Sequence, residues 1–239
     1  MPLVMTPWHD PPSPLGLKSE EVHLWRFPLV SPQPLEHLLD EHELQRARRL
    51  LDAYKARAFV VARARLRQIL AGYLSLSPQK LAFAYGPAGK PELAGLADPP
   101  AFNLAHSGSW GVCAVAGRGE VGVDIETINP ALDYARLARR FFSEAENQWL
   151  SKCPESRRRR CFFRIWTRKE AWLKGKGGGF TDPARDLGAI HLASGCTCDG
   201  GWWLKNLPVA RGSIAALALS RRCSVVQRWN AWPDRHKVL

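Results

Sequence analysis

The chain has 239 residues, of which 46% are hydrophobic and 23% charged, with a formal net charge of +12. This length and apolar content suffice for a substantial core, in one large domain or two smaller halves. No run of about 18 apolar residues occurs, so the sequence predicts no membrane-spanning helix. The first residues lack the charged and apolar regions of a secretory signal, and we therefore expect a cytoplasmic protein without a membrane partner.

The positive charge is concentrated in two segments. Residues 46–67 carry a net charge of +7 and residues 136–185 one of +9, whereas the rest of the chain sums to −4. Clustered charge focuses an electric field and steers association, which favours an anionic partner. Part of the run Arg157–Arg160 can equally be a solvated helix face. With ten tryptophans in the chain, nucleic-acid binding is a further hypothesis.

The six cysteines fall at no zinc-ligand spacing, and residues 196–198 form only an isolated Cys-x-Cys. Scattered reduced thiols of this kind are typical of a cytoplasmic protein.

The N-terminal half begins with a Pro-rich stretch, residues 1–20, for which we expect irregular structure. A strand is predicted at residues 22–27, and the apolar spacing from Leu35 to about Leu74 is helical, with a break near Leu51 and Asp52. Four strand-like stretches follow, at residues 81–85, 101–105, 110–116 and 120–126.

After Pro130 the apolar period is again helical. Helices are predicted at residues 134–142 and 157–174, and between them Ser143 can cap a helix with Glu146 three residues later. Glycines at 175 and 177–179 end the last helix. Further strands are expected at residues 189–192, 201–204 and 214–219. Helices and antiparallel strands in both halves favour the α+β class.

Two carboxylates lie on the strand predicted at residues 120–126. Because side chains alternate along a strand, Asp124 and Glu126 share one face while Val123 and Ile125 occupy the other. The two carboxylates are then about 7 Å apart along the strand. Their repulsion is about 2 kcal/mol at an effective dielectric constant of about 20. A divalent cation would convert this repulsion into attraction, and a few hard oxygen ligands suit Mg²⁺.

A third carboxylate lies on the later helix. Trp166, Glu170 and Lys174 are spaced at i, i+4 and i+8 and therefore lie one above another on one face. Glu170 beside Lys174 could serve a metal, a general base and a general acid together. The alternative is a surface ion pair that stabilises the helix by about 0.2–0.5 kcal/mol.

Two further elements could contact phosphate. His106 is followed by the small residues Ser107, Gly108 and Ser109, which would allow a phosphate to approach closely. Lys90, between Gly89 and Pro91, could supply a point charge to a phosphate. Each residue taken alone is more commonly structural or simply solvated.

The order of these motifs resembles one known family. Gly-Lys-Pro at 89–91, Phe-Asn-x-x-His-Ser at 102–107, Gly-Val-Asp-Ile-Glu at 122–126 and Trp-x-x-Lys-Glu-Ala-x-x-Lys at 166–174 are similar to motifs of the 4′-phosphopantetheinyl transferases of the surfactin-synthetase-activating type. The segment around Glu43, Arg46 and Ala47 and the stretch from Arg139 to Glu146 also resemble this family. The resemblance extends from about Val22 to Phe180.

The resemblance implies an enzyme with a defined reaction and fold. Such enzymes transfer the phosphopantetheine arm of coenzyme A to a serine of an acyl or peptidyl carrier protein and release 3′,5′-ADP. The family fold is a pseudo-dimer of two similar α+β halves, each an antiparallel sheet with helices, with the active site in the cleft between them. We accordingly expect halves at residues 1–120 and 121–239 and a monomeric protein.

The resemblance also assigns roles to individual residues. Asp124, Glu126 and Glu170 match the Mg²⁺ ligands, and Glu170 is the expected base for the carrier serine, directly or through water. Lys174 would stabilise or protonate the departing ADP phosphate. The expected coenzyme A contacts are the basic side chains Lys90, His106, Lys174 and either Arg57 or Arg63. The served carriers could belong to fatty-acid, polyketide or nonribosomal-peptide synthesis.

Two other classes of function remain as alternatives. Acidic clusters with basic surroundings also suit a Mg²⁺-dependent phosphodiesterase or nuclease, although the chain offers one compact triad instead of a larger ligand set. A non-catalytic nucleic-acid binder would show steep salt dependence and would not depend on Asp124 or Glu170. We expect no nucleic-acid partner, because the acidic strand interrupts the positive charge.

Overall fold

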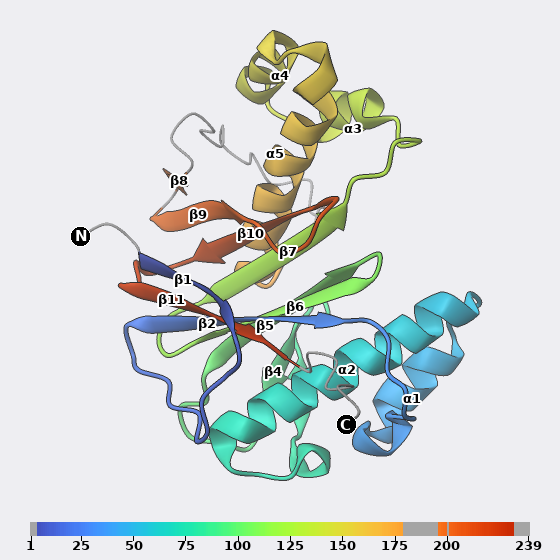
Figure 1. Ribbon diagram of the computed structural model, residues 1–239, viewed down its shortest axis with the longest axis vertical. Helices are drawn as coiled ribbons and strands as arrows, with labels where there is room; N and C mark the ends of the chain where they lie inside the picture. Colours follow the sequence, from blue (N-terminus) through green and yellow to red (C-terminus); the bar gives the residue numbers. More distant parts are fainter. Residues whose placement is uncertain (1–3, 179–195, 200, 232–239) are drawn as a thin grey trace, which may run out of the picture.

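The protein consists of two β-sheets that pack against each other, with helices on their outer faces (Figure 1). The computed structural model describes residues 4–178, 196–199 and 201–231. One core lies between the two sheets, a second between the first sheet and a long helix, and a third between the second sheet and three helices. The mixed α+β class expected from the sequence is confirmed.

The first sheet has five strands in the order β1-β11-β2-β6-β5. Their bounds are β1 Val4–His9, β11 Val225–Asn230, β2 Glu21–Pro28, β6 Trp110–Ala116 and β5 Ala101–Ser107. Strand β11 pairs in parallel with both β1 and β2, whereas β2, β6 and β5 are antiparallel. The end of the chain thus completes a sheet that is otherwise built from the N-terminal half.

The second sheet has the order β7-β10-β9-β8, with all pairs antiparallel. Its strands are β7 Val121–Thr127, β10 Ser213–Leu219, β9 Trp202–Leu207 and β8 Cys196–Asp199. Three strands of each sheet share a local order. In each sheet one strand, β2 or β7, precedes the helices in the sequence, and two antiparallel strands follow them, β5 and β6 or β9 and β10. The last of the three in the sequence, β6 or β10, lies between the other two in the sheet. The small hairpin of β3 (Phe83–Tyr85) and β4 (Pro91–Leu93) stands apart.

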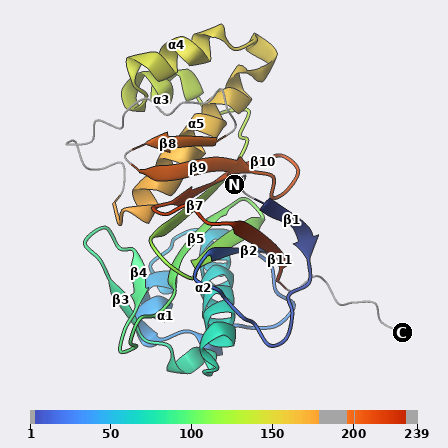
Figure 2. The ribbon, with the colours of Figure 1, turned by 90° about the vertical axis from the view of Figure 1, so that its left-hand side faces the viewer.

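The long helix Ala53–Leu74 covers the outer face of the first sheet, and the other helices of the N-terminal half pack against that helix (Figure 2). The helices of this half are η1 Glu36–Leu38, α1 Glu41–Arg48, α2 Ala53–Leu74 and η2 Pro78–Lys80. The predicted break near residues 51–52 is confirmed, because the Asp52 carboxylate accepts hydrogen bonds from the amides of Tyr54 and Lys55 and starts α2. Asp40 and Glu43 form a capping box at the start of α1.

The helices of the C-terminal half lie on the outer face of the second sheet. They are α3 Tyr134–Phe141, α4 Glu144–Lys152 and α5 Glu155–Gly175. The predicted cap is confirmed, since Ser143 and Glu146 form a capping box at the start of α4. The predicted strand at 189–192 lies outside the described residues.

The expectation of irregular structure for residues 1–20 is wrong for residues 4–9, which form β1. Pro7 has no amide hydrogen, but β1 is an edge strand and its register shifts between Met5 and Trp8. Edge positions and bulges tolerate proline, because no ladder hydrogen bond is required there. The pairing partner, β11, is more than 200 residues away in the sequence.

Candidate active site

Strand β7 separates apolar and acidic side chains onto its two faces. Val121, Val123 and Ile125 are buried in the core between the sheets. Alternation therefore directs Asp124 and Glu126 toward the helical side, where α5 packs on β7 and β10. The two carboxylates share a face, as the sequence predicted.

Gly122 allows α5 to approach β7 very closely. A Cβ atom at this position would collide with the carbonyl oxygen of Ala171 and the backbone of Gly175. Only glycine fits such an approach. This packing brings the neighbouring Glu170 and Lys174 to the acidic face of β7.

Asp124 is the most deeply buried of the three carboxylates, at 2% exposure. Lys174 Nζ donates a hydrogen bond of 2.5 Å to Asp124 Oδ1, whereas Oδ2 is buried without a hydrogen-bond partner. Burial raises the pKa of Asp124 above its ordinary value, against the opposing effect of the Lys174 ammonium. One carboxylate oxygen is therefore available for a further ligand.

Glu126 and Glu170 lie in the same electrostatic environment. Ser107 Oγ donates a hydrogen bond of 3.0 Å to Glu126 Oε2, and burial together with the Asp124 charge raises the pKa of Glu126. Burial raises the pKa of Glu170 to about 7; Lys174 opposes this shift, and the charges of Asp124 and Glu126 reinforce it. The pKa of Glu126 thus responds to Asp124, and the pKa of Glu170 responds to both, so we treat the three as one cluster.

Lys174 supplies the positive charge within this cluster. Burial lowers its pKa, but the adjacent Asp124 and the nearby Glu170 and Glu126 outweigh burial, so the pKa of Lys174 is raised. The ammonium therefore stays protonated across the neutral pH range. One positive charge faces three acidic groups, and the cluster is electrostatically unbalanced.

His106 and Lys90 lie at the margin of this cluster. The pKa of His106 is lowered, first because surrounding protein atoms shield the ring from water and second because Lys174 repels its charged form. The residue nevertheless remains exposed overall. Lys90 Nζ donates hydrogen bonds to Gly175 O (3.0 Å) and Glu120 Oε2 (3.2 Å), which ties it to the end of α5. A cavity of about 210 Å³ is lined in part by Lys90 and Glu120.

The two α2 arginines expected to contact coenzyme A, Arg57 and Arg63, lie elsewhere. Arg63 is only 6% exposed, and its guanidinium donates to Glu43 Oε1 (2.6 Å) and to the Tyr85 hydroxyl (2.7 Å). Arg57 is exposed and lines a hollow of about 430 Å³ together with Tyr54. Neither side chain joins the carboxylate cluster.

Two polar residues support β7 in ways that the sequence reasoning missed. Asn103 Oδ1 accepts a hydrogen bond of 2.9 Å from the amide of Val123, and Ser107 Oγ accepts one of 3.0 Å from Thr127 while donating to Glu126. Both residues come from β5, so their side chains link the two sheets. A buried asparagine within an apolar strand was the signal that could have identified Asn103.

The donor set suits a hard divalent cation. Asp124, Glu126 and Glu170 offer carboxylate oxygens, the ligand type of Mg²⁺, and Asp124 Oδ2 is buried and unpartnered. Within the described part of the chain, however, no three His, Cys, Asp or Glu side chains converge closely enough to hold a metal ion. In this arrangement the Lys174 ammonium occupies the position next to Asp124 Oδ1. Asp124, Glu126 and Glu170 thus match such an ion in ligand type and charge, although they do not converge around one point in this arrangement.

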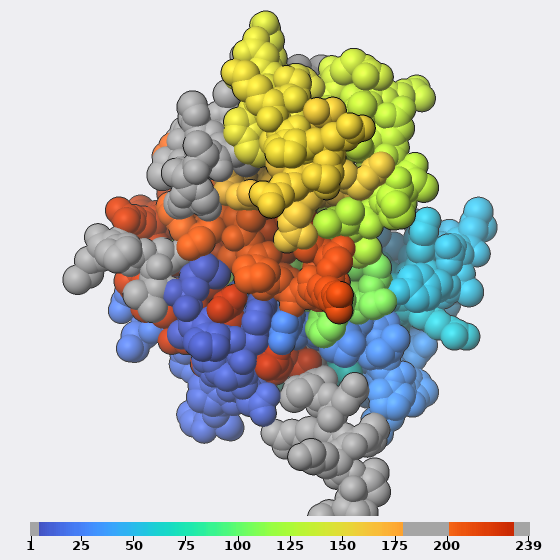
Figure 3. All heavy atoms as spheres, turned by 45° about the horizontal axis from the view of Figure 1, so that its top comes forward, coloured from blue at the N-terminus to red at the C-terminus, as the bar shows by residue number. Residues whose placement is uncertain are grey.

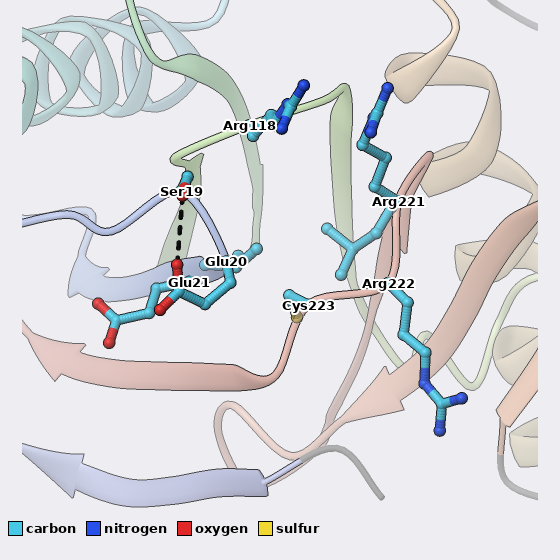
Figure 4. Close-up of a pocket in the computed structure, with 9 residues that line it drawn as sticks. Ser19, Glu20, Glu21, Arg118, Arg221, Arg222 and Cys223 are labelled. Atoms are coloured by element: carbon cyan, nitrogen blue, oxygen red, sulfur yellow. Dashed lines mark hydrogen bonds between the residues drawn. The ribbon is translucent and has the colours of Figure 1, made fainter. Parts of the chain in front are cut away.

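A separate basic hollow lies near the β6–β7 turn, away from the three carboxylates. It measures about 410 Å³, and Figure 4 shows Arg118, Arg221 and Arg222 around it with Cys223 between them. Glu21 at the start of β2 and the preceding Glu20 lie on its other side. Since none of its lining residues belongs to the carboxylate cluster, this hollow is distinct from the candidate site.

None of the helices in the described part of the chain combines the length and apolar character needed to cross a membrane.

Comparison with known proteins identifies the family. Residues 120–197, which include β7 and α5, match the family model of the 4′-phosphopantetheinyl transferase superfamily. The chain is 41% identical over 182 residues to the 4′-phosphopantetheinyl transferase HetI of Nostoc sp. (strain PCC 7120), covering 72% of this chain and 75% of HetI. The chain belongs to the 4′-phosphopantetheinyl transferase superfamily. The prediction of an enzyme of this family is thereby confirmed.

Relatives of this transferase include more than one type. It is 39% identical over 112 residues to AcpT of Escherichia coli (strain K12), covering 47% of this chain and 55% of AcpT. It is 31% identical over 139 residues to the 4′-phosphopantetheinyl transferase of Bacillus subtilis, covering 58% of this chain and 60% of the relative. The family is therefore established at the level of the superfamily.

Proposed function

We propose that this transferase is of the surfactin-synthetase-activating type and moves the 4′-phosphopantetheine group of coenzyme A onto a serine of an acyl or peptidyl carrier protein. The observation that carries the proposal is the unbalanced cluster of Asp124, Glu126 and Glu170 with Lys174, built by β7 and α5 within the segment that matches the family. The reaction forms a bond between the serine oxygen and phosphorus, breaks the pyrophosphate linkage and releases 3′,5′-ADP.

Asp124, Glu126 and Glu170 would hold Mg²⁺. When bound, the ion would neutralise negative charge on the coenzyme pyrophosphate and on the cluster itself. The buried, unpartnered Asp124 Oδ2 supports this assignment, because a carboxylate oxygen without a donor is costly to bury.

Glu170 is the proposed base for the carrier serine, directly or through water. Without a bound metal its pKa is raised to about 7, which lies near the pH at which a base must accept the serine proton. An ordinary glutamate is too weak a base at that pH, so the neighbouring acids and burial adjust this residue to the task.

Lys174 is the proposed acid or electrostatic partner for the departing 3′,5′-ADP phosphate. Its ammonium stays protonated beside Asp124, and proton transfer or hydrogen bonding would offset charge that develops on the leaving oxygen. The proton removed from serine goes to Glu170, and Lys174 can supply one to the leaving group, so protons balance over the reaction.

Lys90 and His106 are the proposed contacts for the phosphates of coenzyme A. Both lie at the edge of the carboxylate cluster, and Lys90 is anchored to the end of α5. Of the α2 arginines we propose Arg57 as the further contact, since its side chain is exposed while Arg63 is engaged by Glu43 and Tyr85. Arg63 would then act by holding Tyr85.

We also propose that the fold is a pseudo-dimer with coenzyme A bound between its halves. The repeated strand order, β2-β6-β5 in one sheet and β7-β10-β9 in the other, supports a division near residue 120. Strand β11 crosses from the second half into the first sheet, so the second half contributes one strand to that sheet. A chain that contains both halves would act as a cytoplasmic monomer, without a nucleic-acid or membrane partner.

The direct test incubates the protein with coenzyme A, Mg²⁺ and a panel of apo carriers from fatty-acid, polyketide and nonribosomal-peptide synthesis. Intact mass spectrometry of each carrier should show the addition of one phosphopantetheine group, with an equal amount of 3′,5′-ADP in the supernatant. Absence of the mass gain on every carrier would overturn the proposal. Release of nucleotide without a modified carrier would favour a phosphodiesterase.

A further inference from the structure

Two arginines and two tryptophans form an alternating stack, here called the Arg–Trp ladder, which comprises Arg228, Trp8, Arg26 and Trp110. The guanidinium carbon of Arg26 lies 4.6 Å from the ring centroid of Trp8 and 5.7 Å from that of Trp110. The guanidinium carbon of Arg228 lies 5.3 Å from the Trp8 centroid. Such stacking holds the guanidinium planes against aromatic faces and leaves their in-plane N–H groups free to donate.

The ladder is built at one end of the space between the sheets. Trp8 and Trp110 pack at the border of the inter-sheet core, and Trp8 Nε1 donates to Pro208 O (3.1 Å) in the β9–β10 turn. All four ladder side chains are half-buried. In Figure 3 the dark blue N-terminal residues lie beside the orange β9–β10 region on the molecular surface. The ladder is therefore anchored, yet solvent can reach it.

The two guanidinium groups are not neutralised by the described residues. Arg26 donates to Asn230 Oδ1 (2.8 Å) and Val209 O (2.5 Å), and Arg228 donates to Thr6 O, all uncharged acceptors. Burial lowers the pKa of both arginines, and Arg228 lowers the pKa of Arg26 further. A half-buried pair of like charges without a counter-charge is unfavourable in the isolated protein. An anionic partner would relieve it.

The ladder begins next to the candidate active site. Trp110 pairs with Ser107 across the β5–β6 hairpin, and Ser107 Oγ donates to Glu126. Arg26 of β2 lies on the next strand, opposite Val112 of β6. A stable protein interface buries about 800 Å² per partner, so it extends well beyond a single reacting group. A protein that covers Ser107 and the β5–β6 hairpin beside Glu126 would therefore also reach the ladder.

We propose that the Arg–Trp ladder binds acidic side chains of the carrier protein while its serine is presented to Glu170. This inference rests on the proposed function, and it assigns a docking surface to the partner of that reaction. Carboxylates of the carrier would accept hydrogen bonds from guanidinium N–H groups of Arg26 and Arg228. The interaction would strengthen carrier binding without contacting coenzyme A or the reacting atoms.

An acidic protein segment suits the ladder better than a nucleic acid does. Single-stranded nucleic acids stack their bases on open aromatic faces, and a guanidinium already lies over each of the two indole rings. Arg26 uses Nε and Nη1, and Arg228 uses Nε, for hydrogen bonds within the described residues. Stacking fixes the positions of the remaining guanidinium N–H donors, which is the geometry that carboxylates recognise.

The test compares steady-state kinetics of Arg228→Gln, Arg26→Gln and the double variant with the unchanged protein, with apo carrier and coenzyme A varied separately. The double variant should raise the KM for the carrier about tenfold, the order expected for losing a charge partner. Its kcat and its KM for coenzyme A should stay within about twofold of the unchanged protein, because the ladder touches no reacting group. Arg228→Lys should recover part of the loss.

Arg118→Gln is the matched control, since it removes one exposed positive charge near the distant β6–β7 turn. An equal rise in carrier KM in this control, or an unchanged KM in the double variant, would overturn the proposal. Arg228→Gln alone decides the question if Arg26→Gln does not fold. Loss of oligonucleotide binding with an unchanged carrier KM would show a nucleic-acid surface. If the unchanged protein modifies no carrier, the proposed function is overturned, and so is this docking surface.

Discussion

Two buried charge clusters, one in each half, differ in their balance. In the N-terminal half, Glu43 is 1% exposed and accepts hydrogen bonds of 2.6 Å from both Arg63 and Arg67, and Arg67 also pairs with Asp40 at 2.5 Å. Two positive charges there meet two negative charges. In the C-terminal half, the single ammonium of Lys174 pairs with Asp124, and the charges of Glu126 and Glu170 also act on it.

This difference separates a structural cluster from a functional one. The balanced cluster joins α1 to α2 and needs no further ligand. In the unbalanced cluster, the pKa values of Asp124, Glu126 and Glu170 are all raised, so repulsion and burial make the fully ionised form costly. Sites that keep such a cost commonly bind a ligand or perform chemistry.

The largest expected effect is the loss of transfer in the unbalanced cluster. Asp124→Asn and Glu170→Gln should each lower kcat/KM about 10³-fold or more, because they remove a metal ligand or the base. Both variants should fold, since neither removes core volume. Glu155→Gln, an exposed position on the same helix, is the control and should be fully active. Full activity of Glu170→Gln would remove this residue from the mechanism.

The next effect is a loss of stability in the balanced cluster. Arg67→Met should lower the free energy of unfolding by about 3–5 kcal/mol, because it leaves Glu43 buried with fewer partners. Urea unfolding measures this change. The exposed pair of Arg48 with Glu41 offers the control, and Arg48→Met should cost less than about 1 kcal/mol. Similar losses of unfolding free energy in both variants would mean that the buried network stabilises the protein no more than an exposed ion pair does.

A smaller effect is the pH dependence that Glu170 imparts. Its pKa is about 7 in the folded protein and is lower when unfolded, so the folded state binds more protons between these values. Without Mg²⁺, the contribution of Glu170 to the free energy of unfolding should therefore rise as pH falls from 8 toward 5. A group whose pKa is lowered on folding would contribute the opposite trend. Glu170→Gln should remove this contribution and be more stable than the unchanged protein at pH 8 by about 1–2 kcal/mol.

Comparison of the two proteins at each pH isolates Glu170, since His106 acts in the opposite direction. The pKa of His106 is lowered on folding, which reduces stability as the pH falls through its folded value. Equal pH profiles for Glu170→Gln and the unchanged protein would contradict the assignment.

The smallest effect concerns a hydrogen bond between α2 and the loop that joins β5 to β6. The Tyr54 hydroxyl on α2 donates a 2.9 Å hydrogen bond to Gly108 O, two residues after His106. Tyr54→Phe should cost less than about 1 kcal/mol, because this bond is exposed to water. A shift in thermal midpoint of no more than about 4 °C would agree with this value. A large loss of transferase activity in Tyr54→Phe would show that α2 positions the β5–β6 loop.

Local patterns predicted the parts of the site that lie on single elements. Strand alternation at Asp124 and Glu126 and the helical spacing of Glu170 and Lys174 required no knowledge of distant contacts. Side-chain partners between elements were not visible in this way. The hydrogen bond from Lys174 to Asp124 and the bridge from Asn103 to Val123 depend on how α5 and β5 pack against β7.

Arg63 and β1 also depend on contacts with distant parts of the chain, which local sequence patterns do not reveal. The family resemblance suggested Arg57 or Arg63 as a coenzyme A contact, and the burial of Arg63 depends on Glu43 of another helix. Strand β1 forms against β11, and a Pro-rich segment gives no local signal for a partner more than 200 residues away. Tertiary contacts therefore determine both the surroundings of Arg63 and the pairing of β1.

The central claim is that a divalent cation balances the cluster of Asp124, Glu126 and Glu170 when coenzyme A is bound. Thermal unfolding at pH 8 with coenzyme A, measured with Mg²⁺ and then with a chelator, tests this claim without relying on catalysis. The account predicts a Mg²⁺-dependent rise in the thermal midpoint of the unchanged protein that is absent in Asp124→Asn. No rise in the unchanged protein, or an equal rise in the variant, would contradict it.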